Sequence, residues 1–233
     1  MKTHLHPVLS KLFQLLICMC FAPALSAYAA DSAGEVVVIK GAAWAQPVGE
    51  AARKLEKGAL IYQSDVIKTE KDSAVQVLFN DQTKFFLGAN SEMSIDKFNN
   101  QFSAGEKGFS TRVLKGTFRF VSGLIARKKP EAMEVNTSVA TIGIRGTHVV
   151  GEVNATSATI ILIEPEDTTR KTSIEVSNQY GSVLIDEPGY GTEIPDEFSP
   201  PSPPRRMRLE TINNIVRSMQ SIQRINIPRP RMP

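Results

Sequence analysis

The sequence is almost free of cysteine. It holds only Cys18 and Cys20, and both lie in one apolar run from Leu12 to Leu25. The residues that follow, Ala27-Tyr28-Ala29, fit the small-x-small rule for signal peptidase cleavage. We therefore expect residues 1–29 to be a signal peptide and the mature chain to lack cysteine. This would exclude disulfides, thiol catalysis, zinc–thiolate sites and iron–sulfur clusters.

Long apolar runs are also missing beyond this segment, and none approaches the length of a transmembrane helix. Neither cysteine follows the small residue that a lipoprotein signal needs. We expect an exported protein of a bacterial periplasm or cell surface that is not a lipoprotein. A retained N-terminal anchor is the alternative.

Histidine is scarce as well, because His148 is the only one after residue 29. One imidazole with no Cys and no Asp/His spacing pattern forms neither a triad nor a metal site, so we interpret His148 as a strand residue. The only Gly-x-Gly, Gly189-Tyr190-Gly191, leads into a Pro-rich stretch and not into a helix. The sequence predicts no catalytic residue, no metal, no cofactor and no nucleic-acid partner.

Carboxylates and aromatic residues offer two weaker functional patterns. Glu164, Glu166 and Asp167 are clustered, but they flank a proline and have no calcium-loop spacing, so a solvated turn is the preferred interpretation. Trp44 and Tyr62 suit a sugar-stacking platform, although an ordinary half-buried pair explains them more simply.

Charge is divided unevenly between the body and the tail. Residues 199–233 hold seven arginines against Glu210 alone, a net charge of +6, whereas residues 30–198 hold 18 basic and 23 acidic residues, a net charge of −5. A basic tail on an acidic body predicts contact with something anionic: a lipid headgroup, a partner or the body itself.

The body has the pattern of an all-β domain. Short β-branched and aromatic runs alternate with Gly, Asn and Asp, and Val75, Val77 and Phe79 are expected to face one side of a strand. Asn80-Asp81-Gln82 is interpreted as a hairpin connection. Ala158–Ile163 is almost continuously apolar, which predicts a strand covered on both faces.

Four further segments follow from composition. We predict an all-β domain over residues 30–194, a Pro-rich spacer over 195–208, an amphipathic helix over 209–227 and an unstructured tail over 228–233. The helix is predicted to dock on the body, to associate with a partner or its own copy, or to lie on an anionic membrane, and we favour docking or self-association.

The most specific motif is Gly-Ile-Arg-Gly-Thr, between two β-rich runs. Gly143 and Gly146 permit a positive φ or close backbone approach. Arg145 carries a planar fork that can donate to carbonyls or clamp a carboxylate. We interpret Gly143, Arg145, Gly146 and Thr147 as a structural turn, with ligand binding by Arg145 as the alternative.

Together these motifs resemble the FecR family of bacterial extracytoplasmic domains. The similarity covers roughly residues 34–194. It is carried by Gly34–Gly41, Gly58, Asp65-Val66-Ile67, Val75–Ile95, Leu114–Leu124 and Gly143–Thr147. The sequence departs from the family at Asp81-Gln82, where members usually have Asp-Gly, and at Thr137-Ser138, where Thr-Pro is common.

The resemblance implies a domain of stacked, short antiparallel strands, sandwich-like or solenoid-like. Founding members are membrane sensors that also have a cytoplasmic anti-sigma segment and a transmembrane helix. Neither is predicted here, so sigma-factor control is not carried over. We expect a non-enzymatic binding or signalling module that recognises a protein or an envelope glycan, with self-association or peripheral membrane contact through the basic helix. The alternative is a hydrolase of envelope glycans that uses scattered carboxylates, which must then converge in one cleft.

Overall fold

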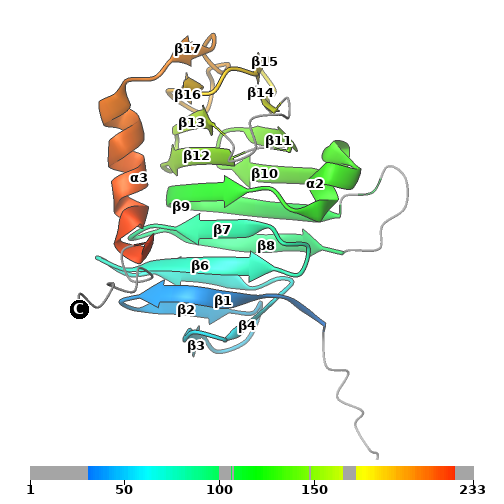
Figure 1. Ribbon diagram of the computed structural model, residues 1–233, viewed down its shortest axis with the longest axis vertical. Coiled ribbons are helices and arrows are strands. Elements are labelled where there is room, and N and C mark those ends of the chain that lie inside the picture. Colours follow the sequence, from blue (N-terminus) through cyan, green and yellow to red (C-terminus); the bar gives the residue numbers. More distant parts are fainter. Residues whose placement is uncertain (1–30, 100–105, 107, 147, 165–171, 224–233) are drawn as a thin grey trace, which may run out of the picture. The chain divides into compact units, whose positions relative to one another are not determined.

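The structure is a computed structural model that describes residues 31–99, 106, 108–146, 148–164 and 172–223, with the backbone alone for 218–223. The predicted signal peptide, Thr147 and the tail over 228–233 lie outside these residues. The fold is all-β, as predicted, and its strands form two layers joined by the long strand β9 (Phe109–Val121) (Figure 1).

Layer A contains the C-terminal half of β9. Its other strands, in spatial order, are β4 (Leu60–Tyr62), β1 (Ser32–Lys40), β6 (Ala74–Phe79), β7 (Lys84–Leu87), then, beyond β9, β12 (His148–Val153), β13 (Ala158–Ile163), β16 (Tyr190–Ile194) and β17 (Arg205–Arg206). All of these pairings are antiparallel.

Layer B contains the N-terminal half of β9. Its other strands, in spatial order, are β3 (Arg53–Lys54), β2 (Ala43–Gln46), β5 (Val66–Thr69), β8 (Glu92–Phe98), then, beyond β9, β10 (Met133–Thr137), β11 (Thr141–Arg145), β14 (Ser173–Asn178) and β15 (Gly181–Ile185). The β9–β10 pair is parallel. A short helix α2 (Leu124–Lys128) and a 3-10 turn η1 (Pro130–Ala132) connect β9 to β10.

Strand β9 changes layers at Gly116. Up to Lys115 the strand pairs with β8 in layer B, and from Gly116 it pairs with β12 in layer A. Gly116 has a φ of 98°, and a Cβ there would lie 2.5 Å from the Cα of Ser91. Only glycine suits such a backbone and such crowding, so the crossing between layers depends on this residue.

The core lies between the layers. Val75, Val77 and Phe79 are buried as the alternation predicted, and the fully buried phenylalanines include Phe109 and Phe120. Strand β13 is covered on both faces, also as predicted. Its Ile160 and Leu162 belong to the central core, whereas Ile161 packs in a second cluster on the opposite side of layer A.

The predicted hairpin is present between β6 and β7. Asp81 is buried there and accepts hydrogen bonds from the Thr83 N–H at 3.0 Å and the Thr83 hydroxyl at 2.8 Å. Gln82 follows Asp81 and has a φ of 69°. Its side chain therefore stands on a left-handed backbone, a conformation that favours glycine.

One buried ion pair fastens β3 to the start of β5. Asp65 is fully buried, lies 2.5 Å from Nη2 of Arg53, and accepts a 2.8 Å bond from the Tyr62 N–H. Burial raises the pKa of the Asp65 carboxyl above its ordinary value, an effect that outweighs the opposing Tyr62 hydrogen bond and the Arg53 charge.

The C-terminal helix α3 (Leu209–Gln223) packs on layer A, where it contacts β9, β12, β6 and β1. The last residues of the predicted helix, 224–227, lie outside the described residues. Ile215 is buried in the second apolar cluster with Phe86, Val150, Ile161 and Met207. The segment predicted as a spacer adds β17, which the sequence did not predict, and Arg205 pairs with Glu193 of the body at 2.7 Å. Self-association and membrane contact of the helix stay predictions.

Candidate functional site

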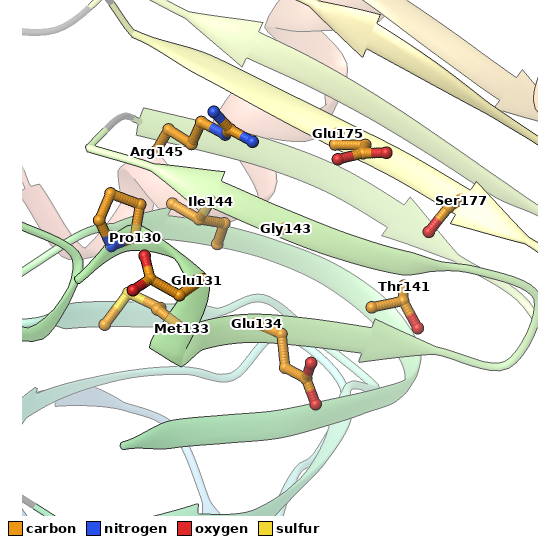
Figure 2. A pocket seen from close by; sticks show the side chains of 10 residues that line it. All are labelled: Pro130, Glu131, Met133, Glu134, Thr141, Gly143, Ile144, Arg145, Glu175 and Ser177. Carbon is orange, nitrogen blue, oxygen red and sulfur yellow. The ribbon is translucent and has the colours of Figure 1, made fainter. Parts of the chain in front are cut away.

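A cavity of about 370 Å³ opens on the outer face of layer B, at one end of β10 and β11 (Figure 2). It is formed by three neighbouring strands and the 3-10 turn that precedes them. The lining residues are Pro130, Glu131, Met133, Glu134, Thr141, Gly143, Ile144, Arg145, Glu175 and Ser177.

Strand register creates this cavity. Gly143 of β11 lies opposite Glu134 of β10 on one side and opposite Glu175 of β14 on the other. The three residues therefore form one row across the sheet. The alternate residues of the same strands, including Ile142 and Ile174, are buried in the core. The outer face is polar because the strands alternate, with apolar side chains inward and polar ones outward.

Gly143 makes the gap in this row. Its φ is not positive, and a Cβ at this position would meet nothing closer than the Glu175 carbonyl oxygen at 3.8 Å. Glycine is therefore required here neither by the backbone conformation nor by close packing. The interpretation of Gly143 as part of a turn needs correction, since Gly143 and Arg145 both lie within β11. Gly146 follows the strand and has a φ of 63°, as a turn residue would.

Arg145 ends β11 and is exposed. Figure 2 shows its guanidinium extending toward Glu175 across the cavity. Within the described part of the chain, its side chain makes no hydrogen bond and has no carboxylate within 4.0 Å. The brace to backbone carbonyls that we favoured from the sequence stays a prediction, because the neighbouring Thr147 is outside the described residues.

Glu134 is held at the rim by neighbours on the same face. Its carboxylate accepts bonds from the Ser110 hydroxyl at 3.1 Å and from the Asn136 amide at 3.3 Å. The Thr141 hydroxyl donates to the Asn136 amide oxygen at 2.8 Å. This network fixes the Glu134 side chain toward β9, as Figure 2 also shows, and leaves the space above Gly143 open.

The other sequence candidates lie apart from the cavity. His148 is buried in β12 of layer A and is not among the lining residues. Trp44 donates to Glu70 at 3.0 Å, whereas Tyr62 packs under Arg53, so they bind different partners. Glu164 is exposed, and Glu166 and Asp167 fall outside the described residues.

Sequence reasoning identified Gly143 and Arg145 but missed Glu131, Glu134, Glu175 and Ser177. These residues come from segments up to forty-odd positions apart and meet only through the β10–β11–β14 pairing. The alternation of polar residues along β14 could have shown that Glu175 and Ser177 lie on an exposed face. It could not have shown which strands pair with β14. Among the described residues, no group of three or more His, Cys, Asp or Glu side chains is arranged to hold a metal.

One protein-family model matches part of the chain. Residues 65–164, which include β5 to β13 and therefore two of the three cavity strands, match the model of the family described as FecR protein. No curated protein matches the chain. In the described residues, no helix is long and apolar enough to cross a membrane.

Two solved structures match the chain, both crystal structures of a "putative anti-sigma factor" from Parabacteroides distasonis ATCC 8503, at 1.65 and 2.50 Å resolution. Each has 13% sequence identity and a TM-score of 0.48, and the match covers 65% of this chain. It spans 64% and 63% of those chains, less than two thirds of their length.

Proposed function

We propose that this chain, which carries a FecR domain over residues 65–164, is a non-enzymatic binding or signalling module exported to the bacterial envelope. It recognises a protein partner or an envelope ligand through the cavity above Gly143. The observation that carries this proposal is a polar cavity on a rigid sheet, lined by opposite charges. Sites built on strands hold their side chains in fixed positions, which suits recognition.

The chemistry of the cavity favours binding over turnover. Its lining has no Cys, His or Lys, and its hydroxyls belong to Thr141 and Ser177, which have no base of the triad type beside them. Glu131 and Glu175 are exposed to water. A glycosidase instead keeps one carboxyl protonated in apolar surroundings, and these two residues lack such surroundings.

Hydrolysis of an envelope glycan is the second candidate, and one observation favours it. Glu131, Glu134 and Glu175 line a single cavity, as that function requires. The Cα atoms of Glu134 and Glu175 are two strand spacings apart, about 10 Å. Hydrolysis uses roughly 5–10 Å between the carboxyl groups themselves, so the Glu134 carboxyl, which is hydrogen-bonded to Ser110 of β9, would have to turn toward Glu175. The double variant Glu134→Gln/Glu175→Gln tests it: release of sugar from purified envelope polymers must occur with the natural protein and stop with the variant.

Crosslinking in intact cells tests the binding proposal. A photoreactive amino acid replaces Ser177, which lines the cavity, and in a matched control it replaces Glu152, which is exposed on the other layer. We expect a discrete adduct, visible as a mass shift, from position 177 and not from position 152. Absence of an adduct at 177, or equal adducts at both positions, would contradict recognition through this cavity.

A further inference from the structure

We propose that the cavity above Gly143 binds a zwitterionic group, with a cationic centre held by Glu175 and a carboxylate held by Arg145. This inference rests on the proposed function and specifies the chemistry of its ligand. The cationic centre is an ammonium or a guanidinium. It comes from the side chains of a peptide segment or from the free ends of a short peptide.

The cavity is lined by two opposite charges, those of Arg145 and Glu175. Arg145 and Glu175 come from neighbouring strands and lie on the same face. Figure 2 shows Arg145 extending toward Glu175. Among the described residues, these two side chains form no ion pair by the 4.0 Å criterion. A ligand that offers a cation to Glu175 and a carboxylate to Arg145 fits between them and satisfies both. Arg145 is suited to this role because its planar fork accepts a carboxylate in a bidentate fashion.

The remaining lining residues set the polarity of the ligand. Ser177 and Thr141 add hydroxyls. Glu131 and Glu134 also line the cavity, but both already have other interactions, such as the hydrogen bonds that Glu134 accepts from Ser110 and Asn136. Glu175 and Arg145 therefore set the charge preference, and a ligand with one charge of each sign suits them better than a simple anion or cation. Aromatic side chains are absent from the lining, which does not favour a sugar ring that binds by stacking.

The volume limits the size of the ligand. Liquid water occupies about 30 Å³ per molecule, so the cavity of about 370 Å³ has room for roughly a dozen non-hydrogen atoms. An α-helix with its side chains is about 10–12 Å across and does not fit. Two side chains on the same side of an extended segment, two residues apart, do fit, and so does a small dipeptide.

The absence of a side chain at Gly143 supports a bound ligand independently of the charges. Several strand glycines in the described residues are explained by crowding: a Cβ on Gly34, Gly151 or Gly191 would lie within 2.5 Å of another atom. Gly143 has an ordinary φ and ordinary space around its missing Cβ. Glycine weakens a strand interior, and here no gain in packing offsets the loss. A ligand that occupies the space above residue 143 accounts for the missing side chain.

Binding of two small peptides to the full-length protein, followed by NMR shifts or calorimetry, tests the proposal. Acetyl-Lys-Gly-Glu-amide offers only charged side chains, which lie on one side of an extended peptide, and Gly-Gly offers only free termini. We expect one of them to bind with a dissociation constant on the order of millimolar, as a ligand of this size allows, and to bind more weakly at high salt. Which of them binds identifies the source of the zwitterion.

Three variants complete the experiment. Gly143→Val should reduce affinity at least about tenfold by filling the cavity, while its melting temperature stays equal or rises, since valine favours strands. Arg145→Gln should reduce affinity about three- to tenfold. Arg112→Gln, a control on the same face but outside the lining, should leave affinity unchanged.

Two results overturn the inference: neither peptide binds, or the Gly143→Val variant folds and binds as well as the natural protein. Both are distinguishable from failure of the proposed function. A crosslinked adduct at position 177 in cells would preserve recognition through the cavity even if the zwitterionic chemistry were wrong.

Discussion

Replacement of Arg53 by methionine should destabilise the domain in a manner that depends on pH. Arg53 is the cation that faces the buried carboxylate of Asp65, 2.5 Å away. Methionine keeps most of the length of the side chain and removes the charge. The variant leaves the buried Asp65 carboxylate without its cation, while the Tyr62 N–H still donates a hydrogen bond to it.

The structure gives the size of this effect. Removal of one partner from a buried pair costs about 3–5 kcal/mol. The Asp65 side chain is 0% exposed but that of Arg53 is 33% exposed, so water partly replaces the guanidinium. We therefore expect a loss of about 2–3 kcal/mol at pH 7, which for a domain of this size lowers Tm by about 4–12 °C.

The direction of the pH dependence follows from the raised pKa of Asp65. A carboxyl whose pKa is higher in the folded state than in the unfolded state contributes stability below the unfolded value of 3.8. That contribution is lost as pH rises through the folded-state pKa. Removal of Arg53 raises the folded-state pKa further. The difference between variant and natural protein should thus be smallest near pH 4 and largest near neutrality.

Urea unfolding followed by circular dichroism at several pH values between about 4 and 7.5 measures this difference. Arg112→Met is the matched control, because Arg112 and Asp96 form a 3.3 Å pair whose side chains are 53% and 31% exposed. The control should cost less than about 1 kcal/mol at every pH. A loss in Arg53→Met that is equally small, or that grows as pH falls, would refute the reasoning.

Three other predictions concern the hairpin, the helix and the N-terminus. Gln82→Gly should raise the free energy of unfolding by about 0.5–1 kcal/mol, because glycine relieves the left-handed backbone at φ 69°; an unchanged or lower value from urea unfolding would contradict this. Ile215→Ala should cost about 2–4 kcal/mol through loss of its buried contacts with layer A, and a Tm equal to that of the natural protein would show that α3 does not dock. Mass spectrometry of the exported protein should find Ala30 as its first residue; an N-terminus at Met1 would contradict cleavage after Ala29.

Local patterns in the sequence predicted the all-β body. Alternation at Val75, Val77 and Phe79 identified the buried side of β6, and the apolar run around Ile161 identified a strand covered on both faces. These predictions succeeded because they depend on periodicity within one strand. The helix stripe around Ile215 was visible for the same reason.

Contacts between strands could not be predicted in this way, because they depend on which residues of neighbouring strands pair. Glu134 and Glu175 meet across Gly143 only because β10, β11 and β14 pair in one alignment. A shift of one residue in either pairing would move a carboxylate to the opposite face. The sequence also gave no sign that Arg205 and Arg206 would pair with β16 as a short strand, since two residues carry no periodicity.

The central claim is that the chain recognises its partner through the space above Gly143. The most direct measurement compares the photo-crosslinked adduct at position 177 in intact cells between the natural protein and the Gly143→Val variant, with the melting temperature of both recorded. Recognition through this space predicts that the adduct disappears in the variant while the melting temperature is maintained. An adduct of undiminished yield in a folded Gly143→Val protein would contradict it.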